Sequence, residues 1–402
     1  MATKKLGFTV FDADNHMYET PDAFTKYLPA DYAGLIKYVQ VDGRTKIAVN
    51  NKISDYIPNP TFERVAAPGA QADYFKNGNP EGKSRREIMG KGIDALPGFS
   101  SPEPRLQLMD ELGIDRALMW PTLASLLEER LRDNPPATHA AIHALNQWMH
   151  EHWTFNFDDR MFPTPVVALN ILDEALKELD WIVERGARII LIRPAPVPGF
   201  MGPRSMALPE FDPFWERVAE ANLLVGMHAS DSGYQRYTNE WEGISDEMTP
   251  FKGGSGFQAI TGHQGRPIID TVASLIGHGL CTRFPTIRFA PVENGSNWVR
   301  PILADMEHAW AQSPHSFDEN PVEAFKRNIY VHPFHEEDPR GLIKILGADR
   351  VLFGSDYPHP EGMFDPITFI DEISNLTPDQ QAKVMGGNLA RLMGVDPTSK
   401  IL

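Results

Sequence analysis

Polar residues that can bind metals or transfer protons follow several short apolar runs in this sequence. After the first run, Phe8–Phe11, come Asp14 and His16, whose side chains face the same way because side chains alternate along an extended chain. Later runs end similarly, with polar residues at the corresponding point: Arg193, His228, Glu293, His332 with His335, and Asp356. This common placement indicates that these residues meet at one end of the fold.

Two carboxylates and two imidazoles in this group form a ligand set for a divalent metal ion. The candidate ligands are Asp14, His16, His228 and Asp356. Such donors suit Zn²⁺, Mn²⁺ or Fe²⁺, and the ion would lower the pKa of bound water to roughly 7. Singly, each residue has a structural alternative, a turn cap for Asp14 or a core histidine for His228. Together they favour a site for a divalent metal ion. His335, in a charged loop, is expected at the surface or behind the site.

Further residues in the same segments are candidates for catalysis and substrate binding. Glu293 ends an apolar run, and a buried carboxylate needs a partner, so we expect it to act with Asp356 in proton transfer. Arg193 is expected to hold a substrate carboxylate through two hydrogen bonds, with a structural ion pair as the alternative. His359 and Asn294 are also expected to bind substrate.

The elements that position these residues alternate between short apolar runs and helical patterns. Eight runs resemble buried parallel strands: Phe8–Phe11, Ala117–Trp120, Pro165–Leu169, Arg188–Ile192, Leu223–Met227, Ile287–Val292, Asn328–Val331 and Val351–Phe353. Helical patterns cover Ile171–Ile182, Phe211–Ala221, Asn294–Trp310 and Pro339–Leu346, and Thr377–Gln380 begins a helix with a capping box. The alternation predicts an α/β fold, a (β/α)₈ TIM barrel, whose active site lies where its strands end. A doubly wound sheet is the alternative, but no glycine-rich phosphate loop follows the first run.

A long segment after the first strand departs from this alternation. We interpret residues 37–100 as an insertion or lid on a single domain spanning residues 1–402, because long loops in compact enzymes are often functional. Within it, Lys46–Val49 and Ile53–Ile57 flank Asn50-Asn51 and predict a small hairpin. A second long loop, Ala229–Gln264, follows the fifth strand.

Composition and charge exclude several classes of protein. The chain has 402 residues, 42% of them hydrophobic, and a net charge of −16, which argues against a nucleic-acid partner. No apolar run approaches the roughly 20 residues of a membrane span, and the first residues lack the apolar stretch of a secretory signal. The single cysteine, Cys281, excludes an internal disulfide. We therefore expect a cytoplasmic enzyme that acts on a small molecule and forms a homodimer or a higher homo-oligomer.

The sequence resembles the amidohydrolase superfamily, and within it the branch that includes aminocarboxymuconate-semialdehyde decarboxylase. The motifs that carry the resemblance are Asp12–His16, Arg105–Ala117, Arg193–Pro194, Gly226–His228, Phe284–Pro285, Gly354–Gly362 and Asn388–Gly394. The resemblance implies a TIM barrel with one catalytic divalent metal ion, zinc as the first choice and manganese or iron as alternatives. It also matches His16, His228 and Asp356 to metal ligands. Two positions depart from the pattern, because Asp14 and Glu293 stand where the superfamily often has histidine.

Three functions remain open from the sequence. The leading hypothesis is a metal-dependent hydrolase that attacks a small, carboxylated or aromatic substrate with a metal-bound water, with Asp356 or Glu293 accepting the proton. The alternative is a non-oxidative, metal-dependent decarboxylase in which Glu293 donates a proton to carbon. A catalytically silent barrel that binds a ligand is the second alternative.

Overall fold

Parallel pairings connect eight segments of the chain. Each segment pairs with the next one in sequence, and the eighth pairs with the first. The computed structural model describes residues 5–54, 57, 59–199, 202–244, 255–261 and 265–402. One three-stranded parallel sheet joins β1 (Phe11–Met17), β7 (Arg116–Pro121) and β8 (Met161–Pro163), and another joins β9 (Ile189–Leu191), β10 (Leu224–His228) and β11 (Arg288–Val292).

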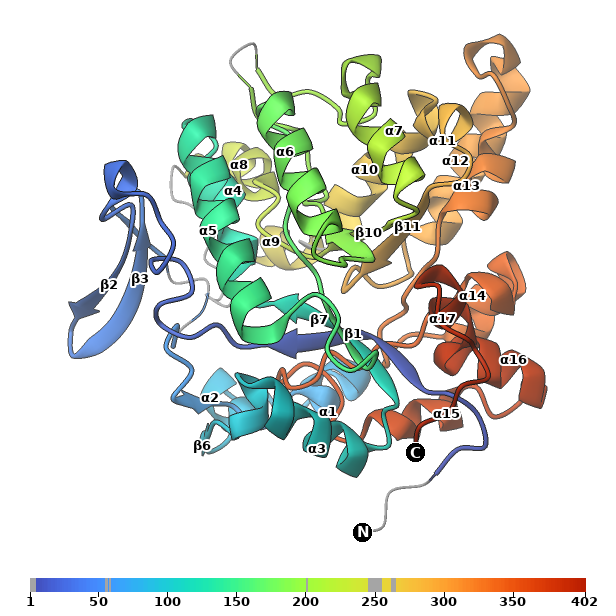
Figure 1. Cartoon of the computed structure of the whole chain (residues 1–402). Helices are drawn as coiled ribbons and strands as arrows, with labels where there is room; N and C mark the ends of the chain where they lie inside the picture. The colour runs from blue at the N-terminus through green and yellow to red at the C-terminus, as the bar shows by residue number, and fades with distance from the viewer. Residues whose placement is uncertain (1–4, 55–56, 58, 200–201, 245–254, 262–264) are drawn as a thin grey trace.

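Single parallel bridges supply the remaining connections. They are Val166 with Leu191, Phe289 with Ile329, Val331 with Val351, and Asn15 with Tyr357. This is the order expected of the predicted barrel, although the third segment joins the fourth, and the seventh and eighth join their neighbours, through isolated bridges instead of ladders. In Figure 1 the helices α5 (Pro135–Trp153), α6 (Leu172–Val183) and α7 (Asp212–Glu220) lie along one side of the strands β10 and β11.

The first strand begins and ends later than predicted. The run Phe8–Phe11 was expected to be the strand, but β1 covers Phe11–Met17 and all seven of its residues are buried. Asp14 and His16 therefore lie within the strand. Polar side chains interrupt the apolar pattern of this strand, so a search for apolar runs does not find it. These side chains can be buried because they form hydrogen bonds inside the protein: Asp12 accepts from Asp14 N at 3.0 Å and from Asn15 Nδ2 at 2.9 Å.

The third strand also differs from its prediction. The ladder of β8 ends at Pro163, and Val166 adds only a single bridge, whereas the predicted strand ran over Pro165–Leu169. Proline has no N–H to donate to a ladder, so Pro163 and Pro165 interrupt the pairing.

Most predicted helices are present with small shifts. Helices α6 and α7, and α14 (Pro339–Leu346), match their predictions within two residues, and α16 (Pro378–Ala382) begins with the expected capping box of Thr377 and Gln380. Helix α12 (Val299–Gln312) begins five residues later than expected, because Glu293 and Gly295 have φ of 54° and 63° and form a turn. The other α-helices are α1 (Ala72–Asn77), α2 (Arg85–Met89), α3 (Pro102–Leu112), α4 (Leu127–Arg130), α8 (Tyr234–Glu242), α9 (Gly256–Thr261), α10 (Gly265–Gly277), α11 (Leu280–Arg283), α13 (Pro321–Asn328), α15 (Phe369–Glu372) and α17 (Asn388–Leu392). None of the described helices is long and apolar enough to cross a membrane.

The segment after β1 forms antiparallel sheets of its own. Strands β2 (Ile36–Val41), β3 (Arg44–Val49) and β4 (Lys52–Ser54) form one, and β5 (Arg64–Val65) and β6 (Ile93–Asp94) form another. The pairing of β3 with β4 confirms the predicted hairpin as far as Ser54; Asp55 and Tyr56 lie outside the described residues. Figure 1 shows β2 and β3 projecting away from the remaining strands.

The same segment then returns to the strand ends. Gly69 N donates to His359 O at 3.2 Å, and Gln71 N donates to Pro360 O at 2.7 Å. Gly69 has a φ of 71°, and a Cβ atom there would lie 2.7 Å from Phe364 N, so this close approach requires glycine.

Candidate active site

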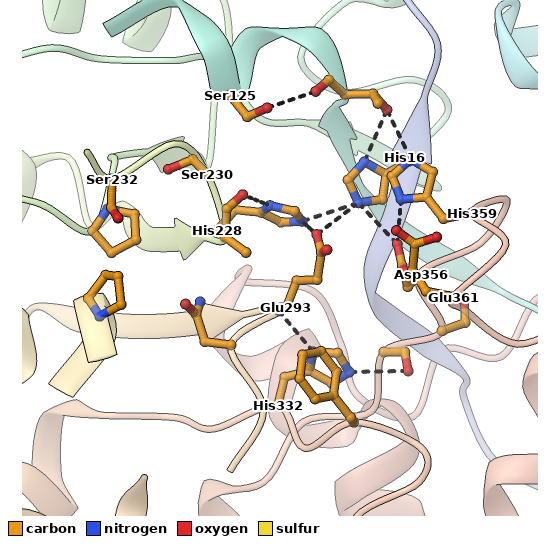
Figure 2. Close-up of a pocket in the computed structure, with 18 of the residues that line it drawn as sticks. His16, Ser125, His228, Ser230, Ser232, Glu293, His332, Asp356, His359 and Glu361 are labelled. Carbon is orange, nitrogen blue, oxygen red and sulfur yellow. Dashed lines mark hydrogen bonds and ion pairs between the residues drawn. The ribbon is translucent and has the colours of Figure 1, made fainter. Parts of the chain in front are cut away.

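Histidine and carboxylate side chains from three strands meet at the carboxyl ends of those strands (Figure 2). Asp14 and His16 come from β1, His228 ends β10, and Glu293 follows β11 directly. Nε2 of His228 lies 3.1 Å from Nε2 of His16, 3.1 Å from Glu293 Oε2 and 3.4 Å from Asp14 Oδ1. One donor atom from each of the four residues lies within 4.8 Å of the others. Asp14 and His16 therefore face the same way, as expected of alternate residues in a strand.

The donor set fits a divalent cation. His228 Nδ1 lies 2.9 Å from Ala229 O, and a carbonyl only accepts, so Nδ1 carries the hydrogen and the lone pair of Nε2 faces the cluster. Asp14 Oδ2 is buried and finds no hydrogen-bond partner among the described residues. A proton on one imidazole could satisfy only part of this set, whereas one cation satisfies two facing imidazole nitrogens and two carboxylates together.

Asp356, the fourth predicted ligand, lies next to this set but outside it. The predicted ligands included Asp356, and its Oδ1 lies 3.4 Å from His16 Nε2. It belongs to a second group with His16 and His359, and to a third with Glu293 and Glu361. The structure thus groups three of the four predicted ligands, Asp14, His16 and His228, with Glu293, and it places Asp356 beside His16 in a separate group.

Burial and mutual charge shift the titration of these residues. Burial, and then the charge of neighbouring carboxylates, raises the pKa of both Glu293 and Asp356 well above the usual range. Burial alone would raise the pKa of Asp14, but hydrogen bonds with His16 and His228 lower it. Burial opposes charging of His228, yet the negative charges of Glu293 and Asp14 raise its pKa. The site therefore concentrates negative charge that a cation or protons must balance.

A threonine hydroxyl connects two of the histidines. Thr122 Oγ1 lies 3.3 Å from His16 Nδ1 and 3.3 Å from His359 Nε2, and it donates to Met17 O at 3.0 Å. His359 Nδ1 lies 2.7 Å from Asp356 Oδ1, and the rings of His16 and His359 are 3.9 Å apart. Sequence reasoning missed Thr122, although it follows the second apolar run as the other site residues follow theirs.

A buried network holds β1 against the loop that carries Asp356. Ser355 N donates to Asp12 Oδ1 at 2.9 Å, and burial raises the pKa of Asp12 to about 7. Arg105 of α3 is fully buried and donates to Gly98 O at 2.9 Å and to His16 O at 2.6 Å. These contacts fix the backbone on both sides of the metal-capable cluster.

Two histidines after the seventh segment also reach this region. His332 Nδ1 lies 3.6 Å from Asp14 Oδ2 and accepts a hydrogen bond from Glu293 N at 3.3 Å. His335 lines the adjacent pocket, its side chain 14% exposed, with Nδ1 3.3 Å from Glu336 Oε2. Burial, and then the nearby His332, lowers the pKa of His335 to about 4.

The three predicted substrate-binding residues differ in their placement. Arg193 pairs with Glu129 at 2.9 Å and donates to Asp231 O at 3.2 Å, and it is not among the described residues that line the pocket. This geometry favours the structural ion pair. His359 and Asn294 do line the pocket, and Asn294 Nδ2 is engaged by Met227 O at 2.9 Å.

The cluster opens into a pocket of about 300 Å³. Residues from both long insertions contribute to its wall: Ile57 and Phe75 come from the first, and Tyr234 and Gln235 from α8 of the second. Figure 2 shows Ser230 and Ser232 on one side of Glu293, and Glu361 on the other. A small molecule in this pocket would contact the metal-capable cluster.

Comparisons with known proteins agree with this architecture. A family model described as amidohydrolase matches residues 12–395. The solved structure of an amidohydrolase from Mycobacterium avium subsp. paratuberculosis K-10 is 36% identical, with a TM-score of 0.90, and the match covers 97% of this chain and 100% of that one. A dihydroxybenzoic acid decarboxylase from Polaromonas sp. JS666, solved with bound manganese, is 17% identical with a TM-score of 0.56, covering 96% and 97% of the two chains.

A curated relative matches over a shorter stretch. The 2-amino-3-carboxymuconate-6-semialdehyde decarboxylase of Dictyostelium discoideum is 25% identical over 138 residues, which is 31% of this chain and 36% of the relative. The chain therefore matches about a third of the length of that relative.

Proposed function

The chain belongs to the amidohydrolase family of enzymes, and on that basis we propose that it is a metal-dependent, non-oxidative decarboxylase built on a TIM barrel. Hydrolysis was the leading hypothesis from the sequence. The relatives named as decarboxylases favour the alternative instead. The silent barrel is the least supported of the three hypotheses, because the metal-capable residues are all present and converge.

Asp14, His16 and His228 would hold the metal ion, with Asp356 or Glu293 as the fourth ligand. A divalent cation in this position supplies the positive charge that stabilises electron density left on the substrate when CO₂ departs. The ion is zinc or manganese in our proposal, and the second of these is supported by the manganese-bound structural relative.

The placement of Glu293 is the observation that carries the proposal. Its carboxyl group lines the pocket, 3.1 Å from His228 Nε2 and 3.8 Å from His16 Nε2, and three further carboxyl groups lie close by: Asp14, Asp356 and Glu361. One divalent cation balances two negative charges, so this set of four retains a proton beside the bound substrate. Decarboxylation consumes such a proton, whereas hydrolysis needs a base at the same point.

The reaction balances with this proton alone. The bond between the substrate carbon and its carboxylate breaks, CO₂ leaves, and the electron pair remains on the carbon. A carboxyl group of the chain, Glu293 or Asp356, then forms the new C–H bond by giving up its proton, which solvent later replaces. No oxidant or further co-reactant is required.

Separate measurement of CO₂ release and of acid release tests this proposal. The manganese-loaded enzyme is offered aromatic carboxylic acids, esters and amides, and both products are followed. We expect CO₂ from a carboxylic acid and no acid from esters or amides. Release of acid without CO₂ would reject the decarboxylase.

Hydrolysis is the second candidate, and one contact favours it. His359 Nδ1 lies 2.7 Å from Asp356 Oδ1, so this pair could accept a proton from an attacking water. The two-product measurement separates this candidate from the first.

We further propose that residues 1–402 form one domain in which residues 37–100 act as a lid. The pocket contacts of Ile57 and Phe75, and the hydrogen bonds from Gly69 and Gln71 to the loop after the eighth segment, support this role. A cytoplasmic location and a homodimer or higher homo-oligomer remain predictions from the sequence.

A further inference from the structure

We infer that Glu129, Arg193 and Arg236 form a clamp that fixes the position of helix α8 as a wall of the pocket. Arg236 is thereby a positioning residue, because it acts on a bound molecule through α8 and is not among the described residues that line the pocket. The clamp does not depend on which reaction the pocket performs. It also gives a role to Arg193, which the sequence assigned to the substrate and the structure pairs with Glu129.

Helix α8 reaches the pocket from the second long insertion. Its first two residues, Tyr234 and Gln235, line the pocket, although the rest of the helix extends beyond it. A shift of α8 would therefore change the width of the pocket beside these two side chains. The contacts that hold α8 against the barrel determine how well this wall is ordered before a ligand arrives.

Burial of apolar surface contributes little to holding α8. A surface helix is usually held by an apolar face that packs on the core. In α8 the two buried side chains, Thr238 and Asn239, are polar, whereas Tyr237 and Trp241 are 50% and 69% exposed. The position of this helix therefore depends more on polar contacts than is usual.

A chain of charged side chains connects α8 to the barrel. Arg236 forms an ion pair with Glu129 of α4, and Figure 1 shows α8 beside α4. Glu129 Oε2 in turn accepts from Arg193 Nη1 at 2.9 Å, and Arg193 follows the fourth strand. Arg193 Nη1 also donates to Asp231 O at 3.2 Å, which holds the loop that leads into α8. The clamp thus ties both the start of the insertion and its first helix to the fourth strand.

Two features make this clamp stronger than an ordinary surface ion pair. The side chains of Arg193 and Glu129 are only 6% and 11% exposed, and charges shielded from water attract each other more strongly. Gly233, which precedes α8, leaves room for the contact. Its φ is 73°, and a Cβ atom there would lie 2.5 Å from Arg236 Nη1 and 2.7 Å from Glu129 Oε2.

Hydrogen exchange of the backbone amides of α8 tests the clamp without any ligand. It is measured by mass spectrometry on the full chain loaded with manganese. The Arg236 side chain is 51% exposed, so Arg236→Gln should fold, and we expect the amides of α8 to exchange about tenfold faster in this variant. Arg236→Lys keeps the charge and should stay within about threefold of the wild type.

The matched control is Asp180→Asn, which breaks the exposed ion pair with Arg217 and should not change the exchange of α8. Unchanged exchange in Arg236→Gln would overturn the inference. Equal acceleration in Arg236→Gln and Arg236→Lys would overturn it as well, because the charge would then not be the cause.

A double substitution tests whether Glu129 is the partner through which Arg236 acts. Glu129→Gln should also accelerate the exchange of α8, and adding Arg236→Gln to it should cause no further acceleration, because the clamp is already broken. A further acceleration of about tenfold would show that Arg236 holds α8 through another contact. If Glu129→Gln fails to fold because Arg193 is left buried without a partner, the two Arg236 variants decide.

Two acids of different size test the effect of the clamp on a bound molecule. Titration calorimetry measures benzoate and 2-naphthoate, a choice that rests on the proposed function. The larger acid fills more of the pocket and should lose about tenfold in affinity in Arg236→Gln, because its binding then has to order α8 as well, whereas benzoate should change by less than about threefold. Faster exchange with unchanged affinities for both acids would overturn α8 as a wall of the pocket. If neither acid binds the wild type, the proposed carboxylate chemistry fails, and the exchange results alone decide the clamp.

Discussion

Thr122 Oγ1 lies 3.3 Å from His16 Nδ1, and this contact determines which ring nitrogen of His16 carries the hydrogen. The single hydroxyl hydrogen of Thr122 goes to Met17 O at 3.0 Å, because a carbonyl only accepts. The hydroxyl must therefore accept from His16 Nδ1–H, which leaves a lone pair on Nε2.

Replacing this hydroxyl should weaken metal binding. Thr122→Val keeps the shape of the side chain but allows the hydrogen of His16 to move to Nε2, where it blocks ligation. We expect a loss of metal affinity of about tenfold or more, as for other residues that orient metal-binding histidines. Competition with a chelator measures this affinity, and Thr122→Ser, which keeps the hydroxyl, should bind metal like the wild type. Equal affinities of the valine and serine variants would contradict the assignment.

Removal of a candidate metal ligand should lower metal binding more than removal of the Thr122 hydroxyl. We expect His16→Ala or His228→Ala to lower bound metal well below one per chain and to abolish activity, because each imidazole faces both Asp14 and the other. Metal analysis after purification measures the stoichiometry. His308→Ala, on the exposed side of α12, is the control. Full metal content in both site variants would show that the ligand set is wrong.

Some residues of the candidate site could be predicted from the sequence because each directly follows an apolar strand. His228 and Glu293 follow recognisable apolar runs, so their convergence follows from the parallel order of the strands. The limits of β1 could not be predicted in the same way, because Asp12 and Asp14 break its apolar pattern while hydrogen bonds and neighbouring charges compensate for their burial. The local sequence does not show which distant residues will form these hydrogen bonds.

Two other residues illustrate the same limit. Arg193 has the right type and position for a substrate carboxylate, yet it pairs with Glu129, a residue 64 positions away in the sequence. Thr122 stands at the expected register, but a hydroxyl is not a distinctive metal-binding or acid-base group. Its role depends on two histidines from opposite ends of the chain, and so only the folded structure reveals it.

Glu293→Gln should separate a proton donor from a metal ligand. The substitution keeps the shape of the side chain and removes its proton. If Asp356 is the fourth ligand, turnover should fall by a factor on the order of 10² or more while metal content stays near one per chain. If Glu293 is the ligand, metal content should fall together with turnover. Parallel measurement of metal content and CO₂ release in Glu293→Gln and Asp356→Asn decides between these assignments. Near wild-type turnover in Glu293→Gln would remove it from the mechanism.

Stability should depend on pH through Glu19, which joins the end of β1 to the turn after β7. Its Oε1 accepts hydrogen bonds from Leu123 N at 2.7 Å and Ala124 N at 3.1 Å, and burial raises its pKa from 4.5 to about 7. The folded state therefore binds more protons than the unfolded state between those two values. It follows that the free energy of unfolding falls as pH rises through this window and levels off above it. The shift corresponds to about 3 kcal/mol at most.

Glu19→Gln keeps the accepting oxygen and cannot titrate, so the difference in unfolding free energy between wild type and variant should decrease across the window. Chemical denaturation at a series of pH values measures this difference, with the exposed Glu216→Gln as control. Parallel curves for the wild type and Glu19→Gln would show that Glu19 remains ionised in the folded protein throughout, held by the two backbone N–H groups.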